Sequence, residues 1–440
     1  MPHAVNSFVV LRAEGVMVLL DLTSGQLPAV LHWGNDVGPL TAADAEAIRR
    51  SGIEPIAPNL VDEPVRVSVL PEHRTGWVGR PGISGSRAGR GWSPRFTTTV
   101  LRLDGRTLDA AGATASLVET GCGVLEVEAV DDVAELGLLV RLELTPGGVL
   151  RSRAAVTNLA DEPYALNDLV LAYPVPTVAR ELLDLAGRWG RERSPQRRDF
   201  TVGVHLREGR KGRTGPDAAT VLHAGVPGFT FGDGEVWAVH TGWSGNHTHY
   251  AERMSTGEQI IGGGELLLPG EMLLGRGESY QSPWLYGSYG HGLDEVARRF
   301  HRLLRSRPNH PSAERPVTLN VWEAVYFNHD LDALIELAER AAEVGVERYV
   351  LDDGWFGSRR DDHSGLGDWI VSADVWPQGL HPIVNKVRDL GMQFGLWFEP
   401  EMVNPDSVVA RAHPEWVMAT GDRQPVLSRF QQVINLGIPE

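Results

Sequence analysis

The feature that most limits the fold of this chain is a change of hydrophobic period near residue 293. Before this point apolar and polar residues alternate, as in 139–157, "LVRLELTPGGVLRSRAAVT", where two alternating runs flank a Pro-Gly-Gly turn. After it, a strand-like stretch is followed by a helix-like stretch three times. The first pattern predicts antiparallel hairpins with one buried face, and the second predicts parallel strands joined by helices. We therefore expect a β-rich part followed by an α/β part.

The boundaries follow from composition and period. We predict a β-sandwich domain over 1–290, a helix and linker over 291–316, and an α/β domain over 317–440. In the helix, 293–304 places apolar residues at i, i+3, i+4 and i+7, with arginines on the opposite face. The segment 305–316, "RSRPNHPSAERP", is rich in proline and charge, which is typical of a join between domains.

The last part contains three predicted βα units. Its strands are expected at 317–322, 348–353 and 393–400, and the helices after the second and third strands at 382–391 and from 404. For the first helix we predict an N-cap at Asp330, an i, i+4 pair between Glu336 and Arg340, and an end at Gly345. An open doubly wound sheet and a (β/α)8 barrel both fit this alternation. A complete barrel takes about 250 residues and eight units, so we expect less than half of a barrel and interpret the chain as a fragment.

Charge and cysteine content restrict the partners and the compartment. The net charge is −16, from 57 acidic and 41 basic residues, which disfavours nucleic acid and anionic membranes as partners. The one cysteine, Cys122, excludes an internal disulfide and fits a reducing compartment. The first 30 residues lack the pattern of a signal peptide, and no stretch has the roughly 20 apolar residues that span a bilayer. We predict a cytoplasmic protein.

Indoles and carboxylates follow all three predicted strands. The residues concerned are Trp322 and Glu323 after the first strand, Asp352, Asp353 and Trp355 after the second, and Trp397, Glu399 and Glu401 after the third. Ligands bind at the carboxyl ends of parallel strands. Indoles pack against the C–H faces of a sugar, and carboxylates accept hydrogen bonds from neighbouring hydroxyls. The pattern predicts a carbohydrate site; the alternative is that the aromatic residues only fill the end of a barrel.

The adjacent pair Asp352 and Asp353 does not fit a catalytic acid and nucleophile. Neighbouring strand residues point to opposite faces, whereas a glycosidase needs two carboxyl groups about 5–9.5 Å apart across the scissile bond. We therefore interpret the pair as substrate-binding. A divalent cation is the alternative, but no further ligands cluster nearby, and we predict no metal.

Two other polar stretches receive structural interpretations. The loop 358–369, "SRRDDHSGLGDW", is expected to be stabilised by salt bridges among its arginines, aspartates and His363. His247 and His249 have the i, i+2 spacing of metal ligands on one strand face, but no third ligand is evident. We expect them to be a surface pair.

At these motifs the sequence resembles the glycoside hydrolase family 36 α-galactosidases, or melibiases. The resemblance is carried by "NVWEAVYF", "LDDGWFGSRRDDHSGLGDW" and "GLWFEPEMVNPDSVVARAHPEW" within 320–416, and it extends to "LPEHRTGWVGRPGISGSRAGRGWSPRFT" at 70–97. It implies a multidomain β plus α/β fold, with an N-terminal β-supersandwich followed by the first half of a (β/α)8 TIM barrel. It further implies retaining hydrolysis of terminal α-1,6-linked galactose in oligosaccharides such as melibiose or raffinose, no metal or organic cofactor, and a homo-oligomer, commonly a tetramer.

The resemblance also assigns roles to individual residues. It implies that Asp352 and Asp353 bind the galactose hydroxyls at carbons four and six, and that Trp322, Trp397 and Arg429 line the pocket. Arg429 lies in "LSRFQQVINL", which departs from the family's usual "RNQ" pattern. The family's nucleophile is the aspartate of a Lys-Trp-Asp motif, and no "KWD" occurs in these 440 residues. We therefore expect both aspartates of the double displacement to lie beyond residue 440, with no catalytic residue in this chain.

Two other functions remain open at this point. The chain could be a non-catalytic carbohydrate-binding or assembly module, or part of a galactosyl transferase, since retaining hydrolases and transglycosidases share an intermediate. Analysis of the products formed from melibiose separates transfer from hydrolysis.

Overall fold

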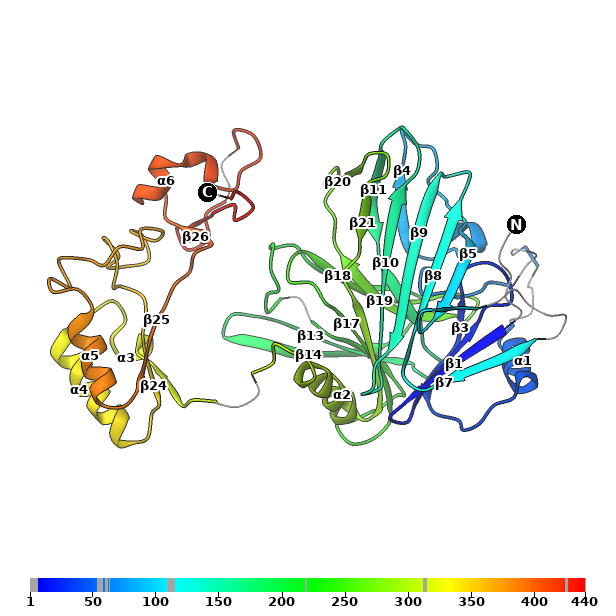
Figure 1. Ribbon diagram of the computed structural model, residues 1–440, viewed down its shortest axis with the longest axis horizontal. Helices are drawn as coiled ribbons and strands as arrows, with labels where there is room; N and C mark the ends of the chain where they lie inside the picture. Colours follow the sequence, from blue (N-terminus) through cyan, green and yellow to red (C-terminus); the bar gives the residue numbers. More distant parts are fainter. Residues whose placement is uncertain are drawn as a thin grey trace. The chain divides into compact units, whose positions relative to one another are not determined.

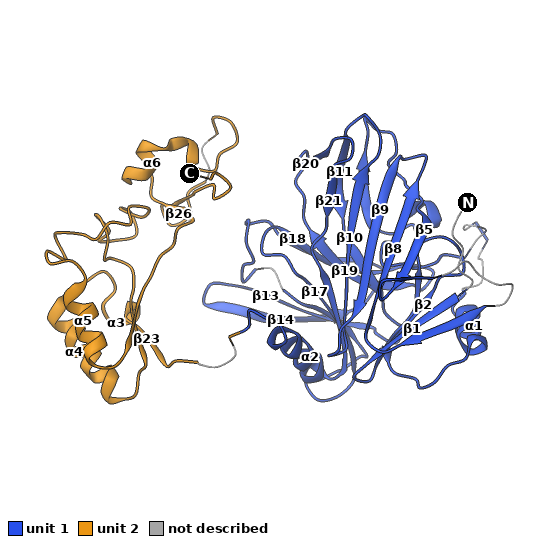
Figure 2. Ribbon diagram, in the orientation of Figure 1, with its two compact units in different colours: residues 1–310 blue, residues 311–440 orange. Residues whose placement is uncertain are grey.

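A computed structural model describes residues 7–53, 58–59, 62, 64–108, 115–217, 220–311, 315–423 and 426–439. The chain forms two compact units, Met1–His310 and Pro311–Glu440 (Figure 2). The division falls inside 305–316, the segment in which proline and charge gather; residues 312–314 of it lie outside the described part.

The first unit is built around the hairpin that the alternating pattern predicts. Strands β9 (Leu136–Leu144) and β10 (Val149–Asn158) pair antiparallel, with Leu144 opposite Leu150. Their alternate side chains are buried, whereas Arg141 and Glu143 between them stay partly exposed. The next strands in the sheet are β8 (Gly123–Asp131), which pairs with β9, and β5 (Thr97–Leu103), which pairs with β8. The alternation of apolar and polar residues thus correctly predicted the β9–β10 hairpin and its buried face.

Around this hairpin the described residues of the unit form one large sheet and three smaller ones (Figure 1). The large sheet has the order β14 (Arg191–Asp199), β13 (Glu181–Arg188), β16 (Leu222–Gly225), β17 (Glu235–Thr241), β22 (Leu285–His291), β10, β9, β8, β5 and β6 (Arg106–Thr107), with β21 (Ser279–Gln281) beside β10. The second has β3 (Ala29–Asn35), β2 (Val16–Asp21), β1 (Ser7–Ala13) and β7 (Ser116–Thr120). The third has β12 (Leu171–Pro174), β19 (Gln259–Glu265), β18 (His247–Arg253) and β15 (Gly203–Gly209), and the fourth β20 (Met272–Leu274), β11 (Tyr164–Leu169) and β4 (Ile83–Ser86).

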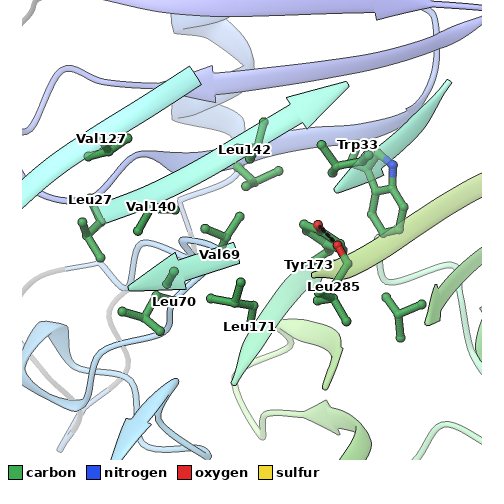
Figure 3. Packing of buried hydrophobic residues seen from close by; sticks show 14 of the residues in the cluster. Leu27, Trp33, Val69, Leu70, Val127, Val140, Leu142, Leu171, Tyr173 and Leu285 are labelled. Atoms are coloured by element: carbon green, nitrogen blue, oxygen red, sulfur yellow. Dashed lines mark hydrogen bonds between the residues drawn. The ribbon is translucent and has the colours of Figure 1, made fainter. Parts of the chain in front are cut away.

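The core of the first unit lies between these sheets. Figure 3 shows side chains from several sheets converging, among them Leu142, Leu171 and Leu285. The ring of Trp33 packs on that of Tyr173 with centroids 4.9 Å apart, and the Tyr173 hydroxyl donates to the Leu285 carbonyl oxygen at 3.0 Å. Because each large apolar side chain contributes about 1.5–3 kcal/mol when fully buried, this packing is the main stabilising contribution. The arrangement is the layered β-domain that the alternation predicts.

The predicted amphipathic helix is present as α2 (Leu293–Arg305), and it packs on β22 and β17 of the first unit. One part of the prediction is wrong, because Arg299 is not on the solvent face but only 5 % exposed. Its Nε donates to the Tyr289 carbonyl oxygen at 2.8 Å, and its Nη2 donates to the Glu14 carbonyl oxygen at 2.9 Å. The guanidinium is buried because these turn and strand-end carbonyls need donors.

The expectation of a surface histidine pair is also wrong. His247 and His249 in β18 are 2 % and 1 % exposed, with ring centroids 5.5 Å apart. Strand β18 lies between β19 and β15, and nearly all of it is buried. The backbone N–H of Thr241 donates to Nε2 of His249 at 3.0 Å, and burial lowers the pKa of His249 well below its usual range. Both histidines are therefore core residues.

The second unit contains the predicted parallel sheet. Strands β23 (Thr318–Asn320), β24 (Arg348–Leu351) and β25 (Gln393–Leu396) pair in parallel in that order. The connections between them contain α4 (Leu331–Glu343) and α5 (His381–Asp389) (Figure 1).

The remaining elements of the described chain are α1 (Ala42–Ser51), η1 (His73–Thr75), α3 (Trp322–Val325), β26 (Met402–Val403), α6 (Val408–Ala412), η2 (Pro414–Trp416) and β27 (Gln432–Val433). Among the described residues, no helix combines the length and apolar character needed to cross a membrane.

The predicted end signals of α4 are confirmed. Asp330 caps the helix by accepting from the backbone N–H of Ala333 at 2.9 Å, and Gly345 follows it with φ +86°. Leu334 and Ala338 are fully buried, and the Tyr349 hydroxyl of β24 donates to the Leu334 carbonyl oxygen at 3.0 Å. These contacts fix the strand on the helix and so fix the place where β24 ends.

Candidate functional site

The site begins where β24 ends. Leu351 is the last residue of the strand, so Asp352 and Asp353 follow it directly and are no longer held to the alternation of a pleated strand. Gly354 then takes φ +111°, and a Cβ atom there would lie 3.2 Å from the Cα of Phe327. Only glycine adopts this backbone conformation without strain. The sharp turn places both aspartates at the carboxyl edge of the parallel sheet.

Asp352 is held by the end of the neighbouring strand. It is 8 % exposed; its Oδ1 accepts from the backbone N–H of Asp353 at 2.7 Å, and its Oδ2 accepts from Nδ2 of Asn320. Asn320 is the last residue of β23, and its Oδ1 accepts from the backbone N–H of Trp322 at 2.8 Å. One asparagine therefore positions both an aspartate and a tryptophan of the predicted site.

Asp353 is held by a buried arginine. Asp353 is 4 % exposed and Arg359 is 0 % exposed. Nε of Arg359 donates to Oδ1 at 3.0 Å and to Oδ2 at 3.1 Å, and Nη2 donates to Oδ2 at 2.8 Å. Such a forked, charge-assisted pair fixes the orientation of the carboxylate as well as its charge.

The electrostatics of the site follow from burial and from like charges. Burial raises the pKa of Asp353, the Arg359 guanidinium opposes this shift, and the neighbouring Asp352 adds to it. Burial also raises the pKa of Glu399, and the charge of Glu401 adds to the rise. His329 lies beside these groups, and burial lowers its pKa to about 4, so its imidazole is neutral at pH 7. The site therefore combines acceptor carboxylates with a neutral ring.

Two of the three tryptophans at the strand ends keep an accessible surface. Trp322 is half-buried, with its ring 5.1 Å from that of Phe327, and Trp397 is half-buried, with its ring 5.9 Å from that of Trp369. Trp355 is different, because it is 2 % exposed and its indole N–H donates to the Trp397 carbonyl oxygen at 3.1 Å. Our expectation that Trp355 belongs to the carbohydrate site is therefore wrong: it is a core residue that supports Trp397.

Arg429 joins this site at its outer edge. Its side chain is 59 % exposed, and its Nη2 donates to Oδ1 of Asp362 at 3.1 Å. The same Asp362 oxygen lies 3.7 Å from Nη2 of Arg359. The predicted residues Asp352, Asp353, Trp322 and Trp397 thus lie at the strand ends, and Arg429 is linked to Asp353 through Asp362 and Arg359.

The loop 358–369 does more than stabilise itself. Arg359 binds Asp353 outside the loop, and its Nη1 donates to Oδ1 of Asn404 at 3.1 Å. That Asn404 oxygen also accepts from the backbone N–H of Leu366 at 2.9 Å. The predicted salt bridges are present at Asp362, whereas His363 packs its ring against Phe430 with centroids 3.8 Å apart. The loop is therefore part of the support of the aspartate pair.

Chemically, this arrangement can accept hydrogen bonds from hydroxyl groups beside half-buried indole faces. No group of three or more His, Cys, Asp or Glu side chains within the described ranges is arranged to hold a metal ion. The described residues thus offer the contacts of a sugar-binding site.

The comparisons with known families agree with this chemistry. The profile described as "Glycosyl hydrolase family 36 N-terminal domain" matches residues 26–275, more than half of the chain. The chain belongs to glycosyl hydrolase family 36. The profile described as "Melibiase" matches residues 279–440, so the two matches together reach into both units.

Family 36 relatives extend over most of this chain. It is 38 % identical to an α-galactosidase of Escherichia coli over 414 residues, covering 93 % of this chain and 56 % of the relative. It is 35 % identical to α-galactosidase AgaA of Geobacillus stearothermophilus over 332 residues, covering 74 % of this chain and 46 % of the relative. The chain therefore spans about half the length of the curated relatives it matches.

Solved family 36 structures share the fold. A variant of AgaA from G. stearothermophilus in complex with raffinose matches with a TM-score of 0.85 and 28 % identity, covering 97 % of this chain and 61 % of that chain. A second AgaA variant, in complex with stachyose, matches with a TM-score of 0.84 at the same identity and coverage. The predicted fold class, an N-terminal β-supersandwich followed by the first part of a TIM barrel, is confirmed.

Sequence reasoning missed three residues of the candidate site. They are Asn320, Arg359 and Asn404, all of which act on the aspartate pair or its arginine. A signal existed for Asn320, which is a polar residue at the end of a predicted strand next to the one that carries Asp352. Arg359 and Asn404 lie in loops 45 residues apart, and nothing local in the sequence pairs them.

Proposed function

We propose that this chain forms the galactose-binding part of an α-galactosidase that hydrolyses terminal α-1,6-linked galactose with retention of configuration. The observation that carries the proposal is the buried pair Asp352 and Asp353 at the end of β24, fixed by Asn320 and Arg359. Raffinose and stachyose are the sugars bound in the AgaA complexes, and those structures are of a relative and not of this chain.

The site chemistry supports galactose for a physical reason. Galactose and glucose differ only in the orientation of the hydroxyl at carbon four. Two fixed carboxylates recognise one orientation of a hydroxyl and leave the other without its partner, which costs about 1–3 kcal/mol for a buried group. Trp322 and Trp397 then provide apolar surface for the sugar ring.

A titration tests the proposal. The purified chain is titrated with methyl α-galactoside and with methyl α-glucoside by ligand-observed NMR, and Asp352→Asn serves as the matched variant. We expect saturable binding of the galactoside, at least about tenfold weaker binding of the glucoside, and a clear loss of galactoside affinity in the variant. Equal affinity for the two sugars, or an unchanged variant, would overturn the galactose assignment.

We also propose that the protein acts in the cytoplasm as a homo-oligomer. The single cysteine supports a reducing compartment. Supporting self-association, β14 is an edge strand of the large sheet (Figure 1). The turn that joins it to β13 carries Trp189, which is 86 % exposed. Light scattering tests the homo-oligomer: a mass of at least twice 48.1 kDa is expected, and a mass of 48.1 kDa contradicts it.

A further inference from the structure

The Arg359 side chain at the sheet edge of the second unit has a hydrogen-bond partner on each of its three guanidinium nitrogens. Two of its nitrogens engage Asp353, at 2.8–3.1 Å. The third, Nη1, donates to Oδ1 of Asn404 at 3.1 Å and to the Ser364 carbonyl oxygen at 3.3 Å. The guanidinium also lies over the ring of Phe327, 5.5 Å from its centroid. With all three nitrogens bonded and no exposed surface, the group has one orientation.

The position of Asp353 explains why such a partner is needed. Asp353 is buried directly beside Asp352, and a buried carboxyl next to a second carboxylate tends to keep its proton. A protonated carboxyl has a donor where a sugar hydroxyl needs an acceptor. Arg359 opposes protonation, and because it meets both oxygens from one side, it leaves other lone pairs of the carboxylate available.

We propose that Arg359 is a positioning residue of the galactoside site, which holds Asp353 ionised and in one orientation so that the sugar hydroxyls meet preformed acceptors. The inference rests on the proposed function. Arg359 acts through Asp353, and its role is to prepare that carboxylate.

The neighbouring arginine provides a matched control. Arg360 donates from Nη1 to the Gly354 carbonyl oxygen at 3.1 Å and from Nη2 to the Gly357 carbonyl oxygen at 3.2 Å, and it also bonds the Ser372 hydroxyl. Within the described part of the chain, no ion pair or hydrogen bond joins Arg360 to a carboxylate. It therefore holds the Gly354 turn and the backbone of the same loop without bonding either carboxylate of the aspartate pair.

Other titratable groups face the same carboxyl and must be considered in any pH test. They are Asp352 beside it, Asp362 in the loop, Glu399 after β25, and His329, which contacts the Asp353 backbone. The three carboxylates favour the protonated form of Asp353, and Arg359 is the cation in direct contact with it. Removing Arg359 therefore raises the pKa of Asp353, whereas removing Arg360 leaves the hydrogen-bond partners of the Asp353 carboxylate unchanged.

The first experiment measures the dissociation constant of methyl α-galactoside between pH 5 and 9 for the wild-type chain and for Arg359→Ala, Arg359→Lys and Arg360→Ala. For Arg359→Ala we expect affinity at pH 7 to fall about tenfold or more, and the pH below which binding is lost to move upward. Lysine restores the charge without the fork, so Arg359→Lys should regain the wild-type pH dependence with only part of the affinity. Arg360→Ala should keep the wild-type pH dependence, because it removes no partner of the Asp353 carboxylate, and any loss of affinity should be smaller than in Arg359→Ala.

The second experiment is independent of any ligand. The carboxyl 13C signal of Asp353 is followed through a pH titration in the wild-type chain and in Arg359→Lys and Arg359→Ala, with folding checked by circular dichroism. A midpoint of the Asp353 titration that rises by about one pH unit or more in a folded Arg359→Ala variant supports the proposal. If the Arg359→Ala variant does not fold, Arg359→Lys decides the proposal. Its Asp353 midpoint should lie near that of wild type while its affinity for the galactoside falls.

The outcomes separate the two proposals. A wild-type chain that binds neither sugar refutes the proposed function, and the Asp353 titration then decides on Arg359 by itself. Three results would overturn the positioning role of Arg359. The first is an unchanged Asp353 midpoint in Arg359→Ala, and the second is full galactoside affinity in Arg359→Lys. The third is an equal loss of affinity in Arg359→Ala and Arg360→Ala with the same pH profile.

Discussion

Replacing each of the two adjacent aspartates by asparagine should have very different effects on the stability of the second unit. Asp353→Asn removes the carboxylate in direct contact with the Arg359 guanidinium, which is 0 % exposed and keeps only Asp362 as a counter-charge, at 3.7 Å. Removing one partner of a buried ion pair costs about 3–5 kcal/mol. We expect a cost of about 3 kcal/mol, because Asp362 is farther away and partly exposed and compensates only part of the buried charge. Asp352→Asn leaves this pair intact and disturbs one hydrogen bond with Asn320, so we expect a cost of about 1 kcal/mol.

The assay must report on the second unit alone, because the chain has two units that can unfold separately. Hydrogen exchange of peptides covering 348–356, followed by mass spectrometry at increasing urea concentration, gives the opening free energy of β24 directly. The double variant Asp353→Asn with Arg359→Met is the control, and it should recover most of the loss because no buried charge is left unpaired. Equal costs for the two aspartates, or no recovery in the double variant, would refute this reasoning.

Two further outcomes are expected. Glu72 is 4 % exposed, its Oε1 accepts from the Phe96 N–H at 2.7 Å, and burial raises its pKa to about 8. The folded state therefore holds the Glu72 proton more tightly than the unfolded state does. The contribution of this group to the free energy of unfolding is complete below about pH 4.5 and is lost as the pH rises through 8. Urea unfolding of the first unit at pH 5.5, 7 and 8.5 should show this fall, by up to about 1.4 kcal/mol per pH unit, and Glu72→Gln should flatten it; an equal slope in the variant contradicts the assignment. The purified 440-residue chain should release no nitrophenol from nitrophenyl α-galactoside, and measurable release would show that a catalytic pair lies within these residues.

The parts of the fold that were predictable are those set by local patterns. The three parallel strands, α4 and α5 of the second unit follow from hydrophobic period. The ends of α4 follow from Asp330 and Gly345, whose effects act within a few residues. The sheet order of the first unit was not predictable, because β22 pairs with both β10 and β17 across long sequence separations. Arg299 shows the same limit, since its burial depends on carbonyl groups of Glu14 and Tyr289 that no helical pattern reveals.

The candidate site divides in the same way. Asp352, Asp353, Trp322 and Trp397 could be found because each is the first or second residue after a strand, and parallel strands end at one edge. The same rule wrongly included Trp355, because strand ends alone do not show which indoles the following loops cover. Arg359 and Asn404 needed the structure, since the loop that carries one must fold against the loop that carries the other.

The measurement that tests the central claim most directly is the response of the two aspartates to the sugar. The carboxyl 13C signals of Asp352 and Asp353 are followed while methyl α-galactoside is added to the chain, with Asp330, the N-cap of α4, as the internal reference. We predict that both site signals shift along one saturation curve, that the Asp330 signal stays fixed, and that methyl α-glucoside produces much smaller shifts. Saturable binding of the galactoside with both site signals unmoved would contradict the claim that these carboxylates bind the sugar.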